Sequence, residues 1–205
     1  YALMMKGVTK MAEYLMGIDA GTGSVRVALF DFRGQNRAYA VAEYGTTYPK
    51  NGWAEQSDYE WFEALKKAIP ECIKKAGIAA DNIAAITCDA TTNTLVYLDE
   101  NDTSVRPPIL WMDVRATEEA SFIDTIREEY DATKFYKPGF RADTMVPKCM
   151  WVKKNEPENW AKTKTIMEFE DWLNWKLTGR KTVSMSVAAF RWNYDDKNGG
   201  YPVDF

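Results

Sequence analysis

The sequence predicts an α/β protein whose mixed sheet opens as an antiparallel meander and carries flanking helices. Three observations support this fold class. Segments 13–19, 24–31 and 37–45 are apolar or alternating and are separated only by short turns, which is typical of consecutive antiparallel strands. A helical periodicity follows from about residue 58. Apolar runs then alternate with helical patterns, and this order excludes a purely all-β or all-α domain.

The first predicted helix has recognisable start and stop signals. Ser57 precedes the periodic run and Glu60 follows three residues later, which is the pattern of a capping box. Pro70 should kink or interrupt the helix, and Gly77 is suited to end it. One helical face carries the apolar side chains of Trp61, Leu65 and Ala68.

The rest of the chain alternates between short apolar runs and helical patterns. Short strands are predicted at 83–88, 95–98, 109–111 and 165–167. The first of these runs is short and mostly apolar, which is typical of a buried strand. Helices are predicted over 116–130, 145–153 and 169–177, and the last of them ends at Gly179.

The composition excludes several classes of function. The 205 residues carry a net charge of −4 and no cluster of Lys and Arg, which argues against a general nucleic-acid binder. No apolar run approaches the roughly 20 residues that span a membrane. Histidine is absent, which excludes Ser-His-Asp catalysis and histidine-ligated zinc within this chain. Cys72, Cys88 and Cys149 form no CxxC pair, which indicates reduced, mostly buried thiols in a cytoplasmic protein.

The most informative segment is the turn between the first two predicted strands, from Asp19 to Arg26. Its two glycines let a ligand approach the backbone closely, and successive N–H groups in such a turn can form an anion-binding concavity. The carboxylate of Asp19 adds a place for hydrated Mg²⁺, and the guanidinium of Arg26 suits phosphate. The turn therefore predicts a phosphate-binding site with a metal.

The alternative for this turn is a plain β-hairpin, which glycine turns between strands usually form. A P-loop is excluded because the chain lacks GxxxxGK[ST]. A dinucleotide fold is disfavoured because no GxGxxG motif enters a helix. Asp19 and Arg26 favour the phosphate site, since a plain hairpin needs neither residue.

Three further segments carry polar side chains that could contact a ligand. Residues 89–94 lie between two apolar runs, and their Thr and Asn side chains either read sugar hydroxyls or form an ordinary loop. Asp113, taken alone, is best explained as the N-cap of the following helix, and Arg115 is expected to pair with a carboxylate elsewhere. Arg191 either reaches a substrate oxygen or lies over an aromatic ring such as that of Trp192.

Four motifs, in order, resemble those of the N-terminal domain of the FGGY carbohydrate kinases. Residues 17–26 (GIDAGTGSVR) resemble the first phosphate loop of that family. Residues 52–56 (GWAEQ) resemble the segment before its first helix, and residues 108–116 (PILWMDVRA) resemble its LWxDxR element. Residues 171–179 resemble its helix ending in LTG. The resemblance covers most of the chain and implies a ribonuclease H-like fold of the actin and hexokinase type.

The resemblance also implies a reaction and a site. The reaction is transfer of the γ-phosphoryl group of ATP to a sugar hydroxyl, with Mg²⁺ as the metal. The metal is expected at Asp19. The phosphates are expected at Gly21, Thr22, Gly23, Ser24 and Arg26. The sugar is expected at Asp89, Thr92, Asn93, Asp143 and Arg191.

Residues 89–91 (DAT) look most like the ribulokinase branch, which implies a ketopentose such as ribulose as the acceptor. Xylulokinases and glycerol kinases carry a Met-His or Arg-Glu pair where Thr92 and Asn93 stand. Arg191 falls where ribulokinases place a lysine near the sugar, so the match is partial. The alternatives are a xylulokinase-like or polyol- or glycerol-kinase-like member, and a non-catalytic sugar- or nucleotide-binding module of the same fold.

A further alternative is a hydrolase that uses Glu55 and Asp58 as paired carboxylates, although a helix start explains these residues better. Members of the resembling family are much longer and have a second domain that supplies most of the adenosine site. Residues 11–205 are expected to be the N-terminal sugar-binding and phosphate-loop domain, residues 1–10 an extension of uncertain origin, and the C-terminal domain absent. The catalytic base is expected beyond Phe205, so the chain alone should be inactive.

The expected partners are the sugar, the nucleotide and the missing C-terminal kinase domain, without nucleic acid or membrane. Whether the protein forms a homodimer is left open.

Overall fold

The computed structural model describes residues 13–130 and 139–205, which form two compact units. Within the described residues, the first unit holds 13–44 and 61–89, and the second holds 45–60, 90–130 and 139–205. The predicted extension at 1–10 lies outside the described residues. Each unit is built around its own sheet.

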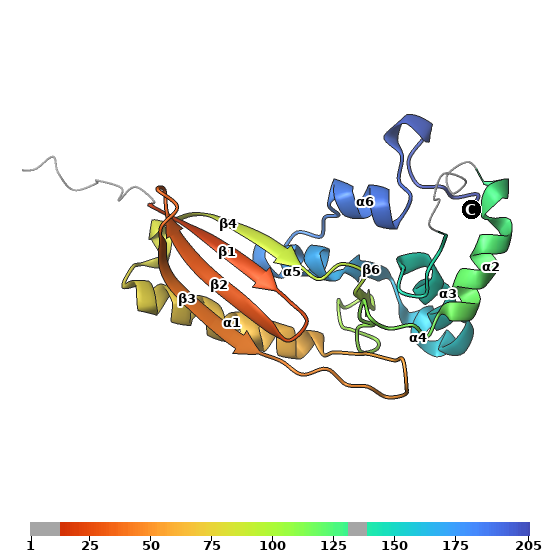
Figure 1. Cartoon of the computed structure of the whole chain (residues 1–205), viewed down its shortest axis with the longest axis horizontal. Coiled ribbons are helices and arrows are strands. Elements are labelled where there is room, and N and C mark those ends of the chain that lie inside the picture. Colours follow the sequence, from red (N-terminus) through yellow and green to blue (C-terminus); the bar gives the residue numbers. More distant parts are fainter. Residues whose placement is uncertain (1–12, 131–138) are drawn as a thin grey trace, which may run out of the picture. The chain divides into compact units, whose positions relative to one another are not determined.

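The first unit contains the predicted antiparallel meander. Its strands are β1 (Tyr14–Ala20), β2 (Ser24–Asp31) and β3 (Asn36–Glu43). A fourth strand, β4 (Ile83–Ala90), lies beside β1, so the strand order is β3-β2-β1-β4. Because β4 runs in the same direction as β1 (Figure 1), the sheet is mixed, as the sequence predicted.

Alternation along the strands builds the core of this unit. Along most of β1, β2 and β3, every second residue is buried, as Met16, Val27 and Ala40 are. Helix α1 (Asp58–Ala76) adds the apolar face predicted for it, with Trp61 and Leu65 both buried. The other buried residues of this helix are Ala64, Ala68 and Cys72.

The ends of α1 match the sequence signals, and the helix is not interrupted at Pro70. Ser57 Oγ accepts the amide of Glu60 at 3.4 Å, and Gly77 follows the helix with a φ of 67°. The predicted interruption at Pro70 is wrong, since the helix continues through it to Ala76. Buried Ala68 and Cys72 lie on either side of Pro70, and this packing holds both turns helical.

The predicted strand at 83–88 exists as β4, but its predicted burial is wrong. Its side chains are partly or largely exposed, and Ile86 is 49% exposed. The physical reason is position: β4 is an edge strand of the sheet, with β1 as its neighbour. A short apolar run does not by itself indicate whether a strand is central or at an edge.

The second unit combines a two-stranded sheet with five helices in its described residues. Strands β5 (Leu95–Leu98) and β6 (Thr165–Glu168) pair antiparallel, with Leu95 opposite Glu168. The helices are α2 (Thr117–Ile126), α3 (Met145–Asn155), α4 (Pro157–Lys162), α5 (Phe169–Thr178) and α6 (Met185–Arg191). Short 3₁₀ turns occur at η1 (Ala80–Asn82, in the first unit), η2 (Arg127–Glu129) and η3 (Asp196–Asn198).

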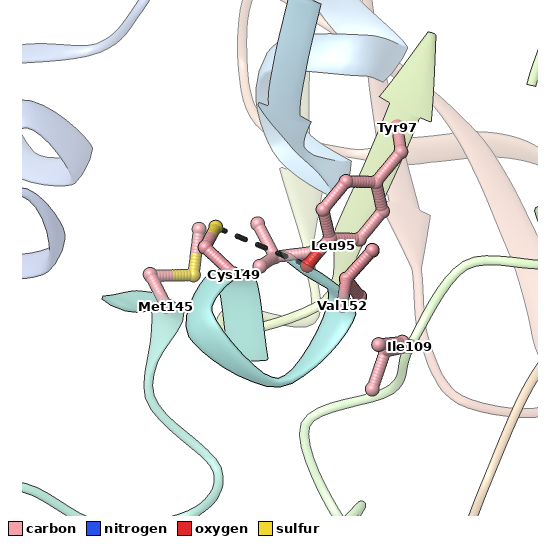
Figure 2. Packing of buried hydrophobic residues seen from close by; sticks show 6 residues of the cluster. All are labelled: Leu95, Tyr97, Ile109, Met145, Cys149 and Val152. Carbon is pink, nitrogen blue, oxygen red and sulfur yellow. Dashed lines mark hydrogen bonds between the residues drawn. The ribbon is translucent and has the colours of Figure 1, made fainter. Parts of the chain in front are cut away.

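The core of the second unit lies between β5 and α3 (Figure 2). The Tyr97 hydroxyl points toward Cys149, with 3.9 Å between Oη and Sγ. Burial raises the pKa of the Cys149 thiol to about 12, so this cysteine is an inert core residue. The six buried members of the cluster are Leu95, Tyr97, Ile109, Met145, Cys149 and Val152.

Three local predictions in this unit differ from the structure. Residues 109–111 form no strand, because Pro107 and Pro108 lack the N–H groups that extend a ladder, and Ile109 makes only isolated bridges to Glu55 and Leu95. Asp113 is not a helix cap, since the N-cap of α2 is Ala116. The helix predicted over 116–130 ends at Ile126 and continues as a 3₁₀ turn.

In the part of the chain that the structure describes, no helix has the length and apolar content to cross a bilayer.

Candidate functional site

The β1–β2 hairpin of the first unit brings Asp19 and Arg26 together. The two residues are register partners, and Arg26 Nη1 donates to Asp19 Oδ2 at 2.9 Å. Their side chains are 50% and 47% exposed, so the pair lies at the surface of the hairpin and is accessible to a ligand. The hydrogen bond and the charge of Asp19 raise the pKa of Arg26, which stays a cation.

The tip of the hairpin is fastened by Tyr44, which follows β3. The Tyr44 amide donates to Gly23 O at 3.2 Å, and the Tyr44 hydroxyl donates to Gly21 O. Gly21 N–H donates to Ser24 O at 3.0 Å, so Gly21 supplies space at the tip rather than a donor. Burial, and then the nearby charge of Asp19, raise the pKa of Tyr44 and keep it a neutral donor. These contacts preorganise the tip.

The predicted phosphate residues divide into an open part and a buried part. A Cβ on Gly21 would lie 3.4 Å from Arg26 Nη1 and 3.8 Å from Asp19 Oδ1, in the space that the charged pair occupies. A Cβ on Gly23 would meet no atom within 4 Å, so the backbone there is open. Ser24 is only 7% exposed. A ligand therefore meets the tip at Gly23 more readily than at Ser24.

The charged pair also lines a cavity of about 340 Å³ in the first unit. Asp89, near the end of β4, lines the same cavity, as do the rings of Phe30 and Tyr39. The sequence assigned Asp89 to the sugar, and the structure brings it to the cavity that holds Asp19 and Arg26. Residues 21–24 do not contribute to the walls of this cavity.

The donor set at the hairpin fits Mg²⁺ that is held mostly by water and phosphate. Across residues 13–130 and 139–205, no group of three or more His, Cys, Asp or Glu side chains is arranged to hold a metal ion. Mg²⁺ in phosphoryl-transfer sites is commonly bound by one or two carboxylates, with water and phosphate oxygens in the other positions. Asp19, half exposed beside an open glycine tip, supplies such a carboxylate.

In the second unit, Asn93 is held in the left-handed conformation, with a φ of 60°. Its N–H donates to the carboxylate of Glu168, which is 1% exposed, and its Nδ2 lies 3.5 Å from Asp143 Oδ2. Asn93 is itself 8% exposed, and its Oδ1 has no hydrogen-bond partner in the described residues. A buried acceptor that is left without a partner is a candidate contact for a ligand.

Among the predicted sugar residues of this unit, the structure brings one pair into contact and leaves Arg191 apart. Asn93 and Asp143 meet, and Asp143 is also paired with Arg141, whose Nε lies 2.9 Å from Asp143 Oδ1. Thr92 is exposed in the turn beside Asn93. Arg191 is the last residue of α6, and within the described residues it forms no hydrogen bond to Asn93 or Asp143.

Sequence reasoning did not single out Lys148, Glu168 or Tyr44 as site residues. Lys148 is completely buried, and its Nζ donates to Asn93 O at 2.6 Å and to Leu110 O at 2.8 Å. The helical spacing carries a usable signal, because Lys148 shares a face with the apolar Met145 and therefore points into the core. No comparable signal marks Glu168 or Tyr44.

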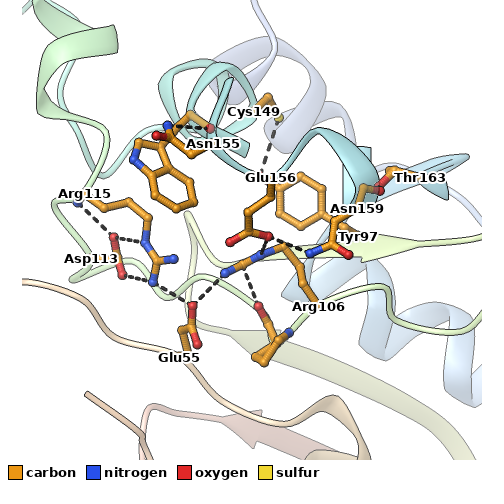
Figure 3. Close-up of polar contacts among 12 residues, drawn as sticks. Glu55, Tyr97, Arg106, Asp113, Arg115, Cys149, Asn155, Glu156, Asn159 and Thr163 are labelled. Carbon is orange, nitrogen blue, oxygen red and sulfur yellow. Dashed lines mark hydrogen bonds and ion pairs between the residues drawn. The ribbon is translucent and has the colours of Figure 1, made fainter. Parts of the chain in front are cut away.

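The second unit contains a network of ion pairs (Figure 3). Its members are Glu55, Arg106, Asp113, Arg115 and Glu156. Arg115 Nη2 contacts Asp113 Oδ2 at 2.7 Å and Glu55 Oε1 at 2.8 Å, which confirms that Arg115 pairs with a distant carboxylate. Arg106 contacts the same Glu55 oxygen at 2.6 Å and Glu156 at 2.8 Å. Because Glu55 is shared by two guanidinium groups, it serves the scaffold rather than a hydrolytic pair with Asp58.

Aromatic rings enclose the centre of this network. The guanidinium carbon of Arg115 lies 3.9 Å from the ring centre of Trp53 and 4.9 Å from that of Trp151. Asp113 Oδ2 also accepts the amide of Ala54 at 2.6 Å. The side chains of Arg115 and Asp113 are both fully buried. The LWxDxR element is therefore a structural clamp between residues 53–55 and 113–115.

A second cavity, of about 560 Å³, lies in the second unit. Its walls include the carboxylates of Glu168 and Asp171 and the ring of Trp192. Burial raises the pKa of Asp171 to about 6, and the charges of Glu168 and Glu170 act in the same direction. The amide of Ser184, which donates to Asp171 Oδ1 at 3.0 Å, opposes this shift.

The meander, the fourth strand and the flanking helix define a mixed α/β domain. Residues 14–201 match the FGGY family of carbohydrate kinases, N-terminal domain. The chain belongs to this family.

Known proteins agree with this assignment. The chain is 34% identical over 176 residues to the xylulose kinase of Lactococcus lactis subsp. lactis, covering 86% of this chain and 35% of the relative. It is 30% identical over 206 residues to the human FGGY carbohydrate kinase domain-containing protein, covering 96% of this chain and 36% of that protein. The crystal structure of xylulose kinase from Rhodospirillum rubrum is similar in fold, with a TM-score of 0.81 and 23% identity. The match covers 93% of this chain and 40% of that chain. The chain spans about a third of the length of these curated relatives.

Proposed function

We propose that this chain is the N-terminal part of an ATP-dependent kinase that phosphorylates a ketopentose. The observation that carries the proposal is the hairpin, where Asp19 and Arg26 pair at 2.9 Å beside an open glycine tip that Tyr44 fastens. Phosphoryl transfer needs positioning and neutralisation of charge more than covalent participation by the protein. A preorganised carboxylate and guanidinium at a glycine tip supply both.

The residues of the hairpin take separate roles in this proposal. Asp19 holds Mg²⁺, which supplies neutralisation of the charge on the transferred phosphoryl group. Arg26 orients the Asp19 carboxylate and offers its remaining N–H groups to phosphate oxygens. Gly21 leaves space for the phosphates, and the open backbone at Gly23 lets them approach closely. Ser24, which is buried, contributes to the shape of the turn through its carbonyl.

The sugar is assigned to the Asn93 loop. The unpartnered Oδ1 of Asn93 accepts a hydrogen bond from a sugar hydroxyl, and Asp143, which contacts Asn93 Nδ2, accepts one from a second hydroxyl. Thr92 lies exposed beside them and adds a hydroxyl contact. The resemblance to the family also assigns Asp89 and Arg191 to the sugar.

The acceptor is a ketopentose, and two candidates differ in what favours them. Thr92 and Asn93 stand where xylulokinases carry Met-His, which favours ribulose. Several relatives are named xylulose kinases, which favours xylulose. A site that hydrogen-bonds hydroxyl groups discriminates strongly against an analogue that presents them differently. The two sugars are therefore expected to differ clearly in kcat/KM.

Residues 11–205 act in this proposal as the sugar-binding and phosphate-loop domain, and a C-terminal domain supplies the adenosine contacts and the catalytic base. The chain alone does not turn over, because closure of two domains around ATP excludes water and completes the site. A cytoplasmic location fits a kinase that uses ATP, and the three cysteines are free thiols.

The proposal is tested by ADP release from the protein that contains this chain, with MgATP and a panel of ribulose, xylulose, ribitol and glycerol. A ketopentose is expected to give the highest kcat/KM, and mass spectrometry should show one added phosphoryl group. The chain alone serves as the inactive control. Absence of phosphorylation with every ketopentose, polyol and glycerol would contradict the proposal.

A further inference from the structure

We infer that Lys148 is a positioning residue for the sugar, because its buried ammonium ties Asn93 to the neighbouring loop and so holds the Asn93 side chain in its binding conformation. This inference rests on the proposed function, since it assigns Lys148 to the sugar half of the site. It concerns a residue that contacts neither sugar nor phosphate in the assignment above.

The geometry of Lys148 is unusual for a lysine. The side chain has 0% exposure in α3, whereas lysines almost always keep their ammonium in water. Its Nζ donates to the carbonyl of Asn93 at 2.6 Å and to that of Leu110 at 2.8 Å. These carbonyls belong to two loops that are 17 residues apart in the chain. The ammonium is therefore a cross-link between the Asn93 loop and the segment that leads into the Arg115 network.

Asn93 has contacts on both of its peptide groups. Its φ of 60° lies in the left-handed region, which asparagine adopts more readily than most residues with a Cβ but which is still less favourable than the right-handed region. Glu168 holds its N–H and Lys148 holds its C=O, which fixes both peptide groups around one Cα. With the backbone held at both peptide groups and Nδ2 held by Asp143, the unpartnered Oδ1 has a defined direction.

The charges around Lys148 come from several elements. Asp113 and Asp143 favour its charged form, Arg115 disfavours it, and the Cys149 thiol in the same helix also faces it. Burial is the largest effect and lowers the pKa of Lys148 to about 7. The strength of the cross-link therefore changes near neutral pH, because an ammonium is a stronger donor than an amine.

A purely apolar role for Lys148 predicts a different outcome from a positioning role. Methionine has similar length and would fill the same space, so packing alone would survive Lys148→Met. The two carbonyl bonds would not survive. Loss of hydrogen bonds to a charged donor corresponds to a change of about tenfold or more in binding.

The experiment compares Lys148→Met with Lys153→Met in the protein that contains this chain. Lys153 is exposed on the same helix and is the matched control. In Lys148→Met, the KM for the ketopentose is expected to rise about tenfold or more, while the KM for MgATP stays within about twofold. The backbone amide hydrogen of Asn93 should also exchange with solvent about tenfold faster than in wild type, while the amide hydrogens of α5 exchange at unchanged rates. Equal sugar KM or equal Asn93 exchange in the two variants would overturn the inference.

A mutation-free measurement decides the case if Lys148→Met does not fold. In the wild-type protein without ligand, the Lys148 Nζ resonance and the carbonyl carbons of Asn93 and Leu110 are followed by NMR from pH 5 to 9. The three are expected to titrate with one midpoint. A titration of Nζ without change at either carbonyl would overturn the inference. Neither exchange nor NMR depends on turnover, so inactivity of the wild type with every ketopentose would count against the proposed function alone.

Discussion

Arg26 and Asp19 face each other directly across the first hairpin, with 2.9 Å between Nη1 and Oδ2. The pair is half exposed, so its contribution to stability is small and its charge is available to a ligand. The carboxylate is positioned by the guanidinium before any ligand arrives. This preorganisation is the feature on which the proposed reaction depends.

Replacement of Asp19 should separate turnover from sugar binding. In the complete enzyme, Asp19→Ala is expected to lower kcat by about 100-fold or more, because the group that holds Mg²⁺ is lost. The sugar KM should stay nearly unchanged. Glu43→Ala, an exposed carboxylate at the end of β3, is the control and should retain activity. Unchanged turnover of Asp19→Ala at limiting Mg²⁺ would show that the assigned role is wrong.

Asn93 allows the binding role of the side chain to be separated from backbone strain. Asn93→Gly and Asn93→Ala should both weaken sugar binding, since both remove Oδ1. Asn93→Ala should also be less stable than Asn93→Gly by about 1 kcal/mol, because a Cβ is costly at a φ of 60° and glycine is not. Urea unfolding and sugar titration measure the two effects. A sugar affinity that is unchanged in both variants would remove Asn93 from the site.

Thr92→Ala offers a complementary case on the same turn. Thr92 is exposed, so the free energy of unfolding should change by less than about 0.5 kcal/mol. The KM for the sugar should nevertheless rise, because a hydroxyl contact is lost. Steady-state kinetics with a varied ketopentose concentration measures this. An unaltered KM would leave Thr92 as an ordinary turn residue.

The Arg115 network should behave as a stability element. Arg115→Met leaves the buried carboxylate of Asp113 without its guanidinium partner, and a loss of about 3–5 kcal/mol is expected. The double variant with Asp113→Asn should recover part of this loss. Arg141→Met is the control, because Arg141 is 70% exposed and its ion pair should contribute less than about 1 kcal/mol. Equal urea midpoints for the two single variants would refute the assignment.

Asp171 should make stability depend on pH. Its pKa is raised to about 6 in the folded state, from about 3.9 in an unfolded chain. Between these values the folded state binds more protons, so this carboxyl makes stability fall as pH rises from about 4 to about 6. Asp171→Asn removes this effect and should gain up to about 3 kcal/mol over wild type between pH 4 and pH 8. If the free energy of unfolding of Asp171→Asn and of wild type, measured with urea, followed parallel curves against pH, this prediction would be contradicted.

Local features were predictable from the sequence because their causes are local. The hairpin from Asp19 to Arg26, the start of α1 at Ser57 and the glycine that ends α5 all depend on neighbouring residues. In each case the chemistry of a few residues determines the backbone. The structure accordingly has these elements at the expected places.

Features with distant partners were not predictable. The exposure of β4 follows from its edge position, which no residue in 83–90 encodes. Asp113 was read as a cap because its acceptor role toward Ala54 joins residues 59 apart in the chain. The anchoring of Asn93 by Glu168 joins residues 75 apart. All three features depend on tertiary packing, which a pattern over a few neighbouring residues does not reveal.

The most direct test of the account is a crystal structure of the protein that contains this chain, with Mg²⁺ and a non-hydrolysable ATP analogue. The account predicts nucleotide phosphates against the β1–β2 tip, with the metal held by Asp19 directly or through water. Phosphates bound elsewhere, with the Asp19–Arg26 pair intact and facing no ligand, would contradict it.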